Sequence, residues 1–405
     1  MGTGYRFGRL RATISGSATM TQHTHATASN RLDYDRTLIL AVEVSGRSWV
    51  VAAQVPGLRQ KSAKQQLAPC ADALMAAVEG YKRRAAAAGM AVDRVIVAYE
   101  SGGSGFWLAR WLQQRGVEVH VMQPSSVPVD RRMRRAKSDR IDADRLLRTL
   151  LAWLRGEPRV CSMVPVPDEA TEDARRPIRE REELIRARVA IVNRIEAVLT
   201  VLGAGEYNPL RRDGRERLGQ LRTALDQLLP PHARAQIERL LDRLDLVCNL
   251  VADLEAQRDQ AVEGETAGQA ERMIQRLARV RGIGVQTATV LVHEAFVRRF
   301  RNARALGSYA GLTGTPYSSG GTQREQGISK DGNRRLRATL VELAWMGLRY
   351  QPDCALSRWF HDRLGSSRGR LRKVMIVALA RKLLIALWRY LQDGAVPQGM
   401  ELKPA

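Results

Sequence analysis

Cysteine and histidine are scarce in this sequence, and their placement excludes several kinds of site. The 405 residues include four cysteines and six histidines, and no two cysteines have the C-x-x-C spacing. Zinc ribbons and disulfide frameworks need closely spaced thiols, so neither is indicated and we expect a reducing, intracellular setting. The histidines are isolated, so a His-based catalytic triad has no support.

Long apolar runs are also missing. Residues 1–36 begin with small and polar side chains and lack the apolar core of a secretory signal, so we expect a disordered extension with Met20 as an alternative start. The most apolar stretch, residues 374–391, has Arg381 and Lys382 at its centre, where charge in lipid is costly. We expect a packed terminal helix there and no membrane partner.

Acidic residues are outnumbered by basic ones. Lys and Arg total 65 against 42 Asp and Glu, which leaves a formal net charge of +23. Arginine supplies most of this charge and suits bidentate phosphate recognition, so nucleic acid is the expected partner. An apolar content of 44% is ample for two or three folded domains.

The first domain is expected at residues 37–165 and has an α/β pattern. Short β-branched runs such as "TLILAVEV", "SWVVAAQV", "RVIVAYE" and "VEVHVM" alternate with helical stretches, which indicates a strand hairpin followed by strand–helix units. Residues 139–154 continue as a helix with a leucine stripe. This domain should therefore be a sheet flanked by helices.

Residues 166–265 have the pattern of long, charged helices. Apolar residues recur in steps of three and four on two segments, and the break between them carries Gly203, Gly205, Pro230 and Pro231. The two helices could fold back on each other as a spacer within one chain or pair with another subunit as a coiled coil. The sequence leaves both open.

The mainly helical third domain is expected at residues 266–395, before a tail at 396–405. It begins with "RGIG", a glycine-rich turn that fits either a helix-hairpin-helix contact to DNA phosphate or an ordinary tight turn. The stretch "TPYSSGGT" follows as a Gly/Ser loop that leads into a basic helix. Ser318 and Ser319 lie among glycines that allow a phosphodiester to approach a hydroxyl closely.

Two acids interrupt apolar strands. Glu43 lies within "LILAVEV" and Glu100 ends "RVIVAYE", and a buried carboxylate needs a partner or a metal. Either acid could instead have an ordinary role, Glu43 on a solvated face and Glu100 as a helix cap.

Two further acids, Asp139 and Asp142, lie on one face of the next helix beside the basic run "DRRMRRAK". Asp139 as an N-cap with Asp142 three positions later is the simpler explanation. Four carboxylates around one point would instead suit a divalent metal for phosphoryl transfer.

Two blocks of the sequence resemble the DEDD-type transposases of bacterial insertion sequences, relatives of the Piv DNA invertase that act as bridge-RNA-guided recombinases. The first block holds "LAVEVS", "VAYESGGSGFWLARWL" and "KSDRIDADRLLR", and the second holds "RGIGVQTA", "LGSYAGLTGTPYSSGGTQREQGISKDGNRRLRATLVELAW" and "ALARKLLIALW". The resemblance spans about residues 37–390. It implies a ribonuclease-H-like, RuvC-like first domain and a helical transposase domain, with the helical coiled-coil insertion expected from periodicity between them.

Matched to the motifs, the resemblance implies that Glu43, Glu100, Asp139 and Asp142 hold Mg²⁺ or Mn²⁺. It implies that Ser319 is the nucleophile, with Ser318 as the alternate, and that acids and serine come from different subunits. The family commonly has aspartate as its first acid, and this sequence has Glu43, one methylene longer.

The implied activity is DNA recombination in a bacterial cytoplasm, at the nucleoid, by a dimer or tetramer that binds element DNA and a guide RNA. The basic residues expected to contact nucleic acid are Arg131, Arg132, Arg134, Arg135, Lys137, Arg281, Arg324, Lys330, Arg334 and Arg335. The alternatives are a metal-dependent nuclease or junction resolvase without a covalent intermediate, a non-catalytic binding protein, and a tyrosine recombinase using Tyr317.

Overall fold

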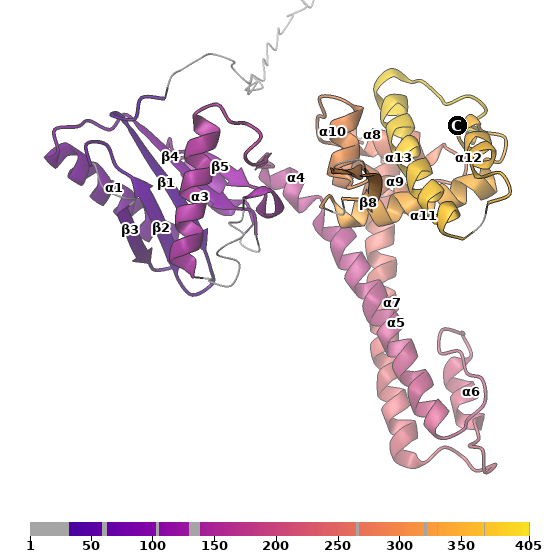
Figure 1. Ribbon diagram of the computed structural model, residues 1–405. Coiled ribbons are helices and arrows are strands. Elements are labelled where there is room, and N and C mark those ends of the chain that lie inside the picture. The colour runs from indigo at the N-terminus through magenta and orange to yellow at the C-terminus, as the bar shows by residue number, and fades with distance from the viewer. Residues whose placement is uncertain are drawn as a thin grey trace, which may run out of the picture. The chain divides into compact units, whose positions relative to one another are not determined.

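The computed structural model of the protein describes most of the chain and divides it into two compact units. The described residues are 32–58, 63–102, 105–128, 138–264, 267–319, 322–329, 331–367 and 369–404. The N-terminal unit extends to Val166 and the C-terminal unit begins at Pro167. Each unit is described by itself, with element labels as in Figure 1.

The N-terminal unit is built on one mixed sheet with the strand order β3-β2-β1-β4-β5-β6. β1 runs parallel to β4 and β4 parallel to β5, while the outer pairs are antiparallel. The strands are β1 (Thr37–Val44), β2 (Trp49–Gln54), β3 (Ala63–Leu67), β4 (Arg94–Glu100), β5 (Glu118–Met122) and β6 (Met163–Val164). The predicted α/β pattern is confirmed, and the strands β3 and β6 were not predicted.

Helices cover both faces of this sheet. α1 (Ala71–Ala87) and α2 (Trp107–Gln113) pack on one face, where the side chains of Leu38, Leu40 and Val42 are buried. α3 (Asp139–Leu154) packs on the other face, and a single 3₁₀ turn, η1, spans Pro124–Ser126. The predicted helix at 139–154 is thus confirmed at both ends.

The C-terminal unit begins with two long helices that pack against each other. α5 (Arg176–Val201) and α7 (Pro231–Glu263) share an apolar core, with the short helix α6 (Gly214–Gln220) between them in the chain and α4 (Glu169–Asp173) before them. The two predicted helices therefore fold back on each other within one chain, as Figure 1 shows. Pairing with a second subunit remains a prediction.

The rest of this unit is a helical cluster around a second large core. Its elements are α8 (Gln269–Ala278), α9 (Val285–Leu291), a π-helical turn η3 (Val292–Phe296), α10 (Ala303–Tyr309), α11 (Arg334–Tyr350), α12 (Ala355–Leu364) and α13 (Arg370–Asp393). α13 contains Arg381 and Lys382 and packs into the core through its leucines, as predicted for a terminal helix. Among the described residues, no helix combines the length and the apolarity needed to cross a bilayer.

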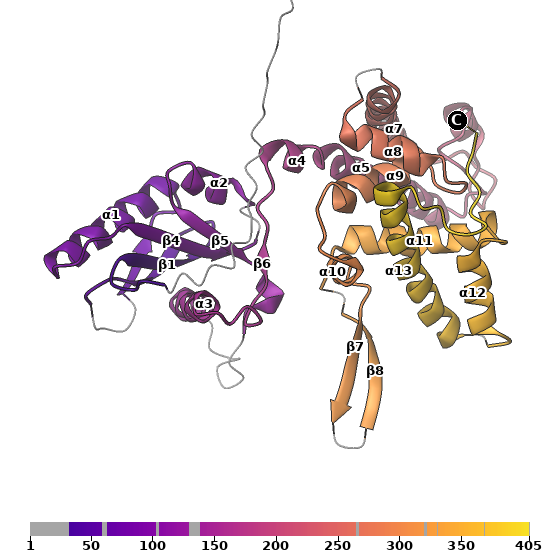
Figure 2. The same ribbon diagram turned by 90° about the horizontal axis from the view of Figure 1, so that it is seen from above.

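A β-hairpin occupies the region where a Gly/Ser loop was predicted. β7 (Gly314–Ser319) pairs antiparallel with β8 (Thr322–Ile328), and the pair extends away from the helices of the unit (Figure 2). The prediction of a loop was wrong because β7, "GTPYSS", is rich in Gly, Thr and Ser, and β8, "TQREQGI", is mostly polar. They lack the apolar alternation that marks a half-buried strand.

Candidate active site

Two strand acids lie on the same face of the sheet. Side chains alternate along a strand, and Ile39 and Ala41 of β1, like Ile96 and Ala98 of β4, contact the core on the α3 side. Continuing the alternation places the next such residue of each strand, Glu43 and Glu100, on this face too. Because β1 and β4 are neighbours, both acids face the helix α3.

Two helix acids lie at the start of α3. Ser138 is the N-cap, and its hydroxyl accepts a hydrogen bond from the Ile141 amide at 3.4 Å. The proposed N-cap role of Asp139 is therefore wrong. Asp142 is 7% exposed and lies one turn before Leu146, which packs on the sheet, so its carboxylate points toward the strand acids.

The three other acids are close enough to Glu43 for their charges to affect its pKa. Burial, as the largest cause, and the negative charges of Glu100, Asp142 and Asp139 together raise the pKa of Glu43 from 4.5 to about 7. A solvated Glu43 would not show this shift. Glu100 does not cap a helix either, since α2 begins after Phe106.

Arg145 is the cation of this cluster, and sequence reasoning missed it. Its Nη2 lies 3.1 Å from an Asp142 oxygen and 3.7 Å from a Glu100 oxygen. Its charge lowers the pKa of Glu43, and its buried Nε has no hydrogen-bond partner among the described residues. The available signal was its position three residues after Asp142, on the same helix face.

The chemistry of the four acids fits a divalent metal. Mg²⁺ and Mn²⁺ prefer hard carboxylate oxygens, and a cation would offset the negative charges of Glu100, Asp142 and Asp139, which add to burial in raising the pKa of Glu43. Within the described ranges, no three Asp, Glu, His or Cys side chains are already grouped as metal ligands. Arg145 instead pairs with two of the four acids.

Most of the residues predicted to contact nucleic acid lie outside the part of the chain that the structure describes. The basic run Arg131, Arg132, Arg134, Arg135 and Lys137 lies outside the described residues, as does Lys330, and only the backbone of Arg324, in β8, is described. Arg334 is exposed at the start of α11.

The serine hairpin ends at the predicted nucleophile. The last backbone pair of β7 and β8 joins Ser319 to Thr322, and the pair before it joins Ser318 to Gln323. Ser318 is exposed. The two candidate serines therefore lie at the far end of the hairpin from α10 and α11.

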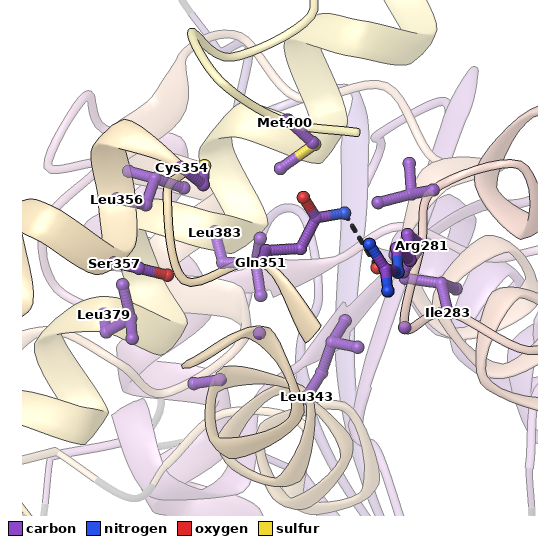
Figure 3. A pocket seen from close by; sticks show the side chains of 14 residues that line it. Arg281, Ile283, Leu343, Gln351, Cys354, Leu356, Ser357, Leu379, Leu383 and Met400 are labelled. Atoms are coloured by element: carbon purple, nitrogen blue, oxygen red, sulfur yellow. Dashed lines mark hydrogen bonds between the residues drawn. The ribbon is translucent and has the colours of Figure 1, made fainter. Parts of the chain in front are cut away.

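The "GIG" turn connects α8 to α9 as predicted, and the C-terminal tail covers part of it. Arg281 forms an ion pair with Glu401, and the Arg281 amide donates to the Glu401 carbonyl. The buried amide of Gln351 donates to the carbonyls of both residues at 2.9 Å, as seen in Figure 3 for Arg281. The cavity beside it, about 30 Å³, holds about one water molecule and is no ligand site.

A second buried acid, Glu294, was not noticed in the sequence although it interrupts the apolar run "TVLVHEAF". It is 1% exposed in the π-helical turn, and its carboxylate accepts from Asn333 Nδ2 at 2.7 Å. Arg335 Nη1 lies 3.3 Å from it and also pairs with Glu182 of α5. Arg335 thus joins α11 to α5, whereas its neighbour Arg334 faces solvent.

Comparison with known proteins decides the family. Residues 274–358 match the profile of the transposase IS116/IS110/IS902 family, and residues 71–203 match the DEDD transposase profile of IS110. The chain is also 43% identical to the y4rJ protein of Sinorhizobium fredii, which is named as a transposase, over 374 residues that cover 90% of this chain and 94% of that protein. The chain belongs to the IS116/IS110/IS902 family of transposases.

Two further relatives of this transposase support the same family assignment. The chain is 30% identical over 83% of a protein from Pseudomonas aeruginosa named as a family 20 transposase, and this alignment covers 73% of the chain. It is 28% identical over 85% of the transposase for insertion sequence element IS1328 of Yersinia enterocolitica, with 74% of the chain aligned.

The matched regions contain most of the candidate site. Glu100, Asp139 and Asp142 lie within the DEDD profile match, and Glu43 precedes it. Ser318 and Ser319 lie within the other matched region. A DEDD transposase domain implies the use of a divalent metal, so the family supports the metal chemistry inferred from the four acids.

Proposed function

We propose that this transposase cuts and rejoins the DNA of an insertion sequence with a divalent metal held by Glu43, Glu100, Asp139 and Asp142. The observation that carries the proposal is the proximity of the two strand acids to the two acids at the start of α3, where burial and the neighbouring negative charges raise the pKa of Glu43 to about 7. When bound, Mg²⁺ or Mn²⁺ supplies Lewis-acid stabilisation of a phosphate and its leaving oxygen. The acids hold the ion, and Ser138 and the packing of α3 fix Asp142 in place.

In the finer form of the proposal, Ser319 is the nucleophile. Its hydroxyl oxygen bonds to phosphorus, the bond from phosphorus to one deoxyribose oxygen breaks, and that oxygen leaves with the proton. The phosphoserine link conserves the bond energy for rejoining. The support is the position of Ser319 at the end of an exposed hairpin and the resemblance of "TPYSSGGT" to the family motif; Ser318 is the alternate.

The proposal extends to partners. An excess of 23 positive charges suits long polyanions, namely element DNA and a guide RNA. Exposed apolar side chains such as Val189, Leu246 and Leu250 on α5 and α7 suit contact with a second subunit, so that acids and serine come from different copies in a dimer or tetramer. Action at the bacterial nucleoid, in the cytoplasm, follows from this role.

A metal-dependent nuclease is the second candidate. The match to a DEDD profile favours it, because four metal-binding acids can direct water at a phosphate without a serine. In that case no protein–DNA link forms, and the hairpin only holds DNA. Two further alternatives remain, a tyrosine recombinase that uses Tyr317 as its nucleophile and a non-catalytic binding protein. The experiment described next gives a different result for each of them.

The experiment is a trapping assay. Full-length protein, Mg²⁺, element-end DNA and the flanking RNA are incubated and run on a denaturing gel beside Ser319→Ala, Ser318→Ala and Asp139→Ala. Asp144→Ala is the matched control, because Asp144 is on α3 but pairs with Lys64.

A protein–DNA band that is lost in Ser319→Ala and Asp139→Ala but retained in Ser318→Ala and Asp144→Ala supports the serine proposal. Nicked DNA without a band, lost only in Asp139→Ala, identifies the nuclease. A band that all of these variants retain points to Tyr317, and no product with any of the proteins points to a non-catalytic role.

A further inference from the structure

A second site in the C-terminal unit has the composition of a nucleotide pocket. An open pocket of about 750 Å³ lies between α11, α12 and the start of α13, elements that lie beside one another in Figure 2. This volume falls within the roughly 300–1,000 Å³ typical of ligand sites. Its lining residues are Trp345, Leu348, Arg349, Phe360, His361, Leu364, Gly365, Ser366, Ser367, Gly369 and Arg372.

An exposed tryptophan forms part of the wall. Trp345 is 38% exposed on α11, and Arg349 lies one turn later on the same helix face. The guanidinium of Arg372 lies 5.0 Å from the centre of the Trp345 ring, a cation–π contact that holds this cation at the pocket. A flat aromatic surface beside cations suits a base and its phosphate.

The two arginines at the pocket are not neutralised by any carboxylate that the structure describes. Among the described residues, neither Arg349 nor Arg372 has an ion pair with a carboxylate. The segment 361–373, "HDRLGSSRGRLRK", carries five Arg and Lys against one Asp. Gly365 and Gly369 have positive φ angles of 50° and 69°, and the hydroxyls of Ser366 and Ser367, which also line the pocket, follow Gly365 in the chain. The rim therefore attracts an anion.

We propose that this pocket binds an unpaired nucleotide of the DNA on which the transposase acts, with the base stacked on Trp345 and the phosphate at Arg349 and Arg372. The proposal rests on the proposed function, since cutting and strand exchange leave unpaired bases. A base inside a duplex is stacked on both sides and does not offer its face to a side chain. A second copy of the chain is a poorer occupant, because it would bring the same cationic rim against this one.

The test is the binding of two short single strands to the full-length protein, measured by fluorescence anisotropy. One strand carries thymine bases, and the other has the same length and charge but no bases. Base stacking contributes about 5- to 100-fold in affinity per base. The wild type should therefore bind the base-bearing strand more tightly than the abasic strand.

The variants separate stacking from charge. Trp345→Ala should weaken binding of the base-bearing strand about 5- to 100-fold and leave the abasic strand unchanged, while Trp345→Phe retains most of the preference. Met346→Ala is the matched control, since Met346 is the neighbouring residue with 37% exposure. Arg372→Ala should weaken both strands.

Three outcomes with the Trp345→Ala variant would overturn the proposal. Trp345→Ala binds both strands like the wild type, or it weakens both equally, or it changes the sedimentation of the protein without changing the base preference, which identifies a self-association surface. If Trp345→Ala weakens the binding of an RNA strand more than the binding of the DNA strand, the pocket binds RNA and the assignment to DNA is wrong. If the wild type binds no strand, the proposed function is wrong as well. If the wild type and Trp345→Ala bind the strands with equal affinity, only the proposal for this pocket is wrong.

Discussion

At the scale of single residues, Glu43 is the most perturbed group of the site. Its carboxyl keeps a proton up to about pH 7 in the folded protein and loses it near pH 4.5 when unfolded. Between these values the unfolded state binds fewer protons, so the free energy of unfolding falls as pH rises through this window. Above about pH 7 this decrease in the free energy of unfolding is complete.

The first prediction concerns this pH dependence. Without divalent metal, Glu43→Gln should match the wild type near pH 4 and exceed it by about 1–3 kcal/mol at pH 8, because the amide never ionises. Thermal unfolding in EDTA at a series of pH values measures this. Adding Mg²⁺ at pH 8 should stabilise the wild type more than the variant. A constant difference between the two proteins at all pH values would contradict the prediction.

A second prediction concerns Arg145, whose charge lowers the pKa of Glu43. Arg145→Met should move the half-point of Mn²⁺ binding to higher pH, because Glu43 then ionises later. At pH 8 and above it should tighten Mn²⁺ binding, because no resident cation competes for Asp142 and Glu100. Titration calorimetry across pH measures both effects.

The matched control is Arg148→Met, an exposed arginine on the same helix. It should leave the pH half-point unchanged. If both variants behave alike, the effect of Arg145 is a general one of net charge and its position between the acids is irrelevant.

At the scale of elements, the spacing of apolar residues predicted the strands and helices that have a strong apolar pattern. β1, β4 and α3 are buried on one or both faces, so their sequences carry the pattern. β3, "AKQQL", is a polar edge strand, and β6 has two residues, so neither carries a signal. β7, "GTPYSS", has no apolar alternation, and the side chains of Thr315, Pro316 and Ser318 are exposed.

The candidate site was predictable only in part. Each of the four acids was visible in the sequence, but each also had an ordinary explanation. Packing of α3 on the sheet brings Asp142 toward the strand acids and places Arg145 among them, and this depends on contacts between residues some hundred positions apart. Glu294 gave the same signal as Glu43, an acid in an apolar run, and its partners come from α5 and α11.

A third prediction follows for these elements. Arg335→Met should destabilise the protein by about 3–5 kcal/mol, because it removes a partner of the buried Glu294 carboxylate and of Glu182. Arg334→Met, at the exposed neighbouring position, should change stability by less than about 0.5 kcal/mol. Urea unfolding at neutral pH measures both. Equal effects would show that Glu294 is supported by Asn333 and Arg179 without Arg335.

At the scale of the whole molecule, the excess of positive charge is large and only part of it is used internally. Arg335 pairs with two carboxylates, and Arg215 lies between Asp242 and Asp245. Such arginines stabilise the fold and are poor phosphate ligands while they are paired. Exposed arginines without such partners carry the surface charge.

The last prediction distinguishes these two kinds of arginine by the salt dependence of DNA binding. Each phosphate contact releases counterions and contributes a slope of about −0.9 to the plot of log affinity against log salt for duplex DNA. The wild type should show a slope steeper than about −5, and Arg334→Met should reduce its magnitude by about 1 if this exposed arginine contacts a phosphate. Arg215→Met should leave the slope unchanged, because its charge is already balanced by two carboxylates. Anisotropy titrations of labelled duplex between about 50 and 200 mM salt measure the slopes. A wild-type slope near zero would mean that the positive charge serves another purpose, and equal slopes for the wild type and Arg334→Met would remove the start of α11 from the DNA interface.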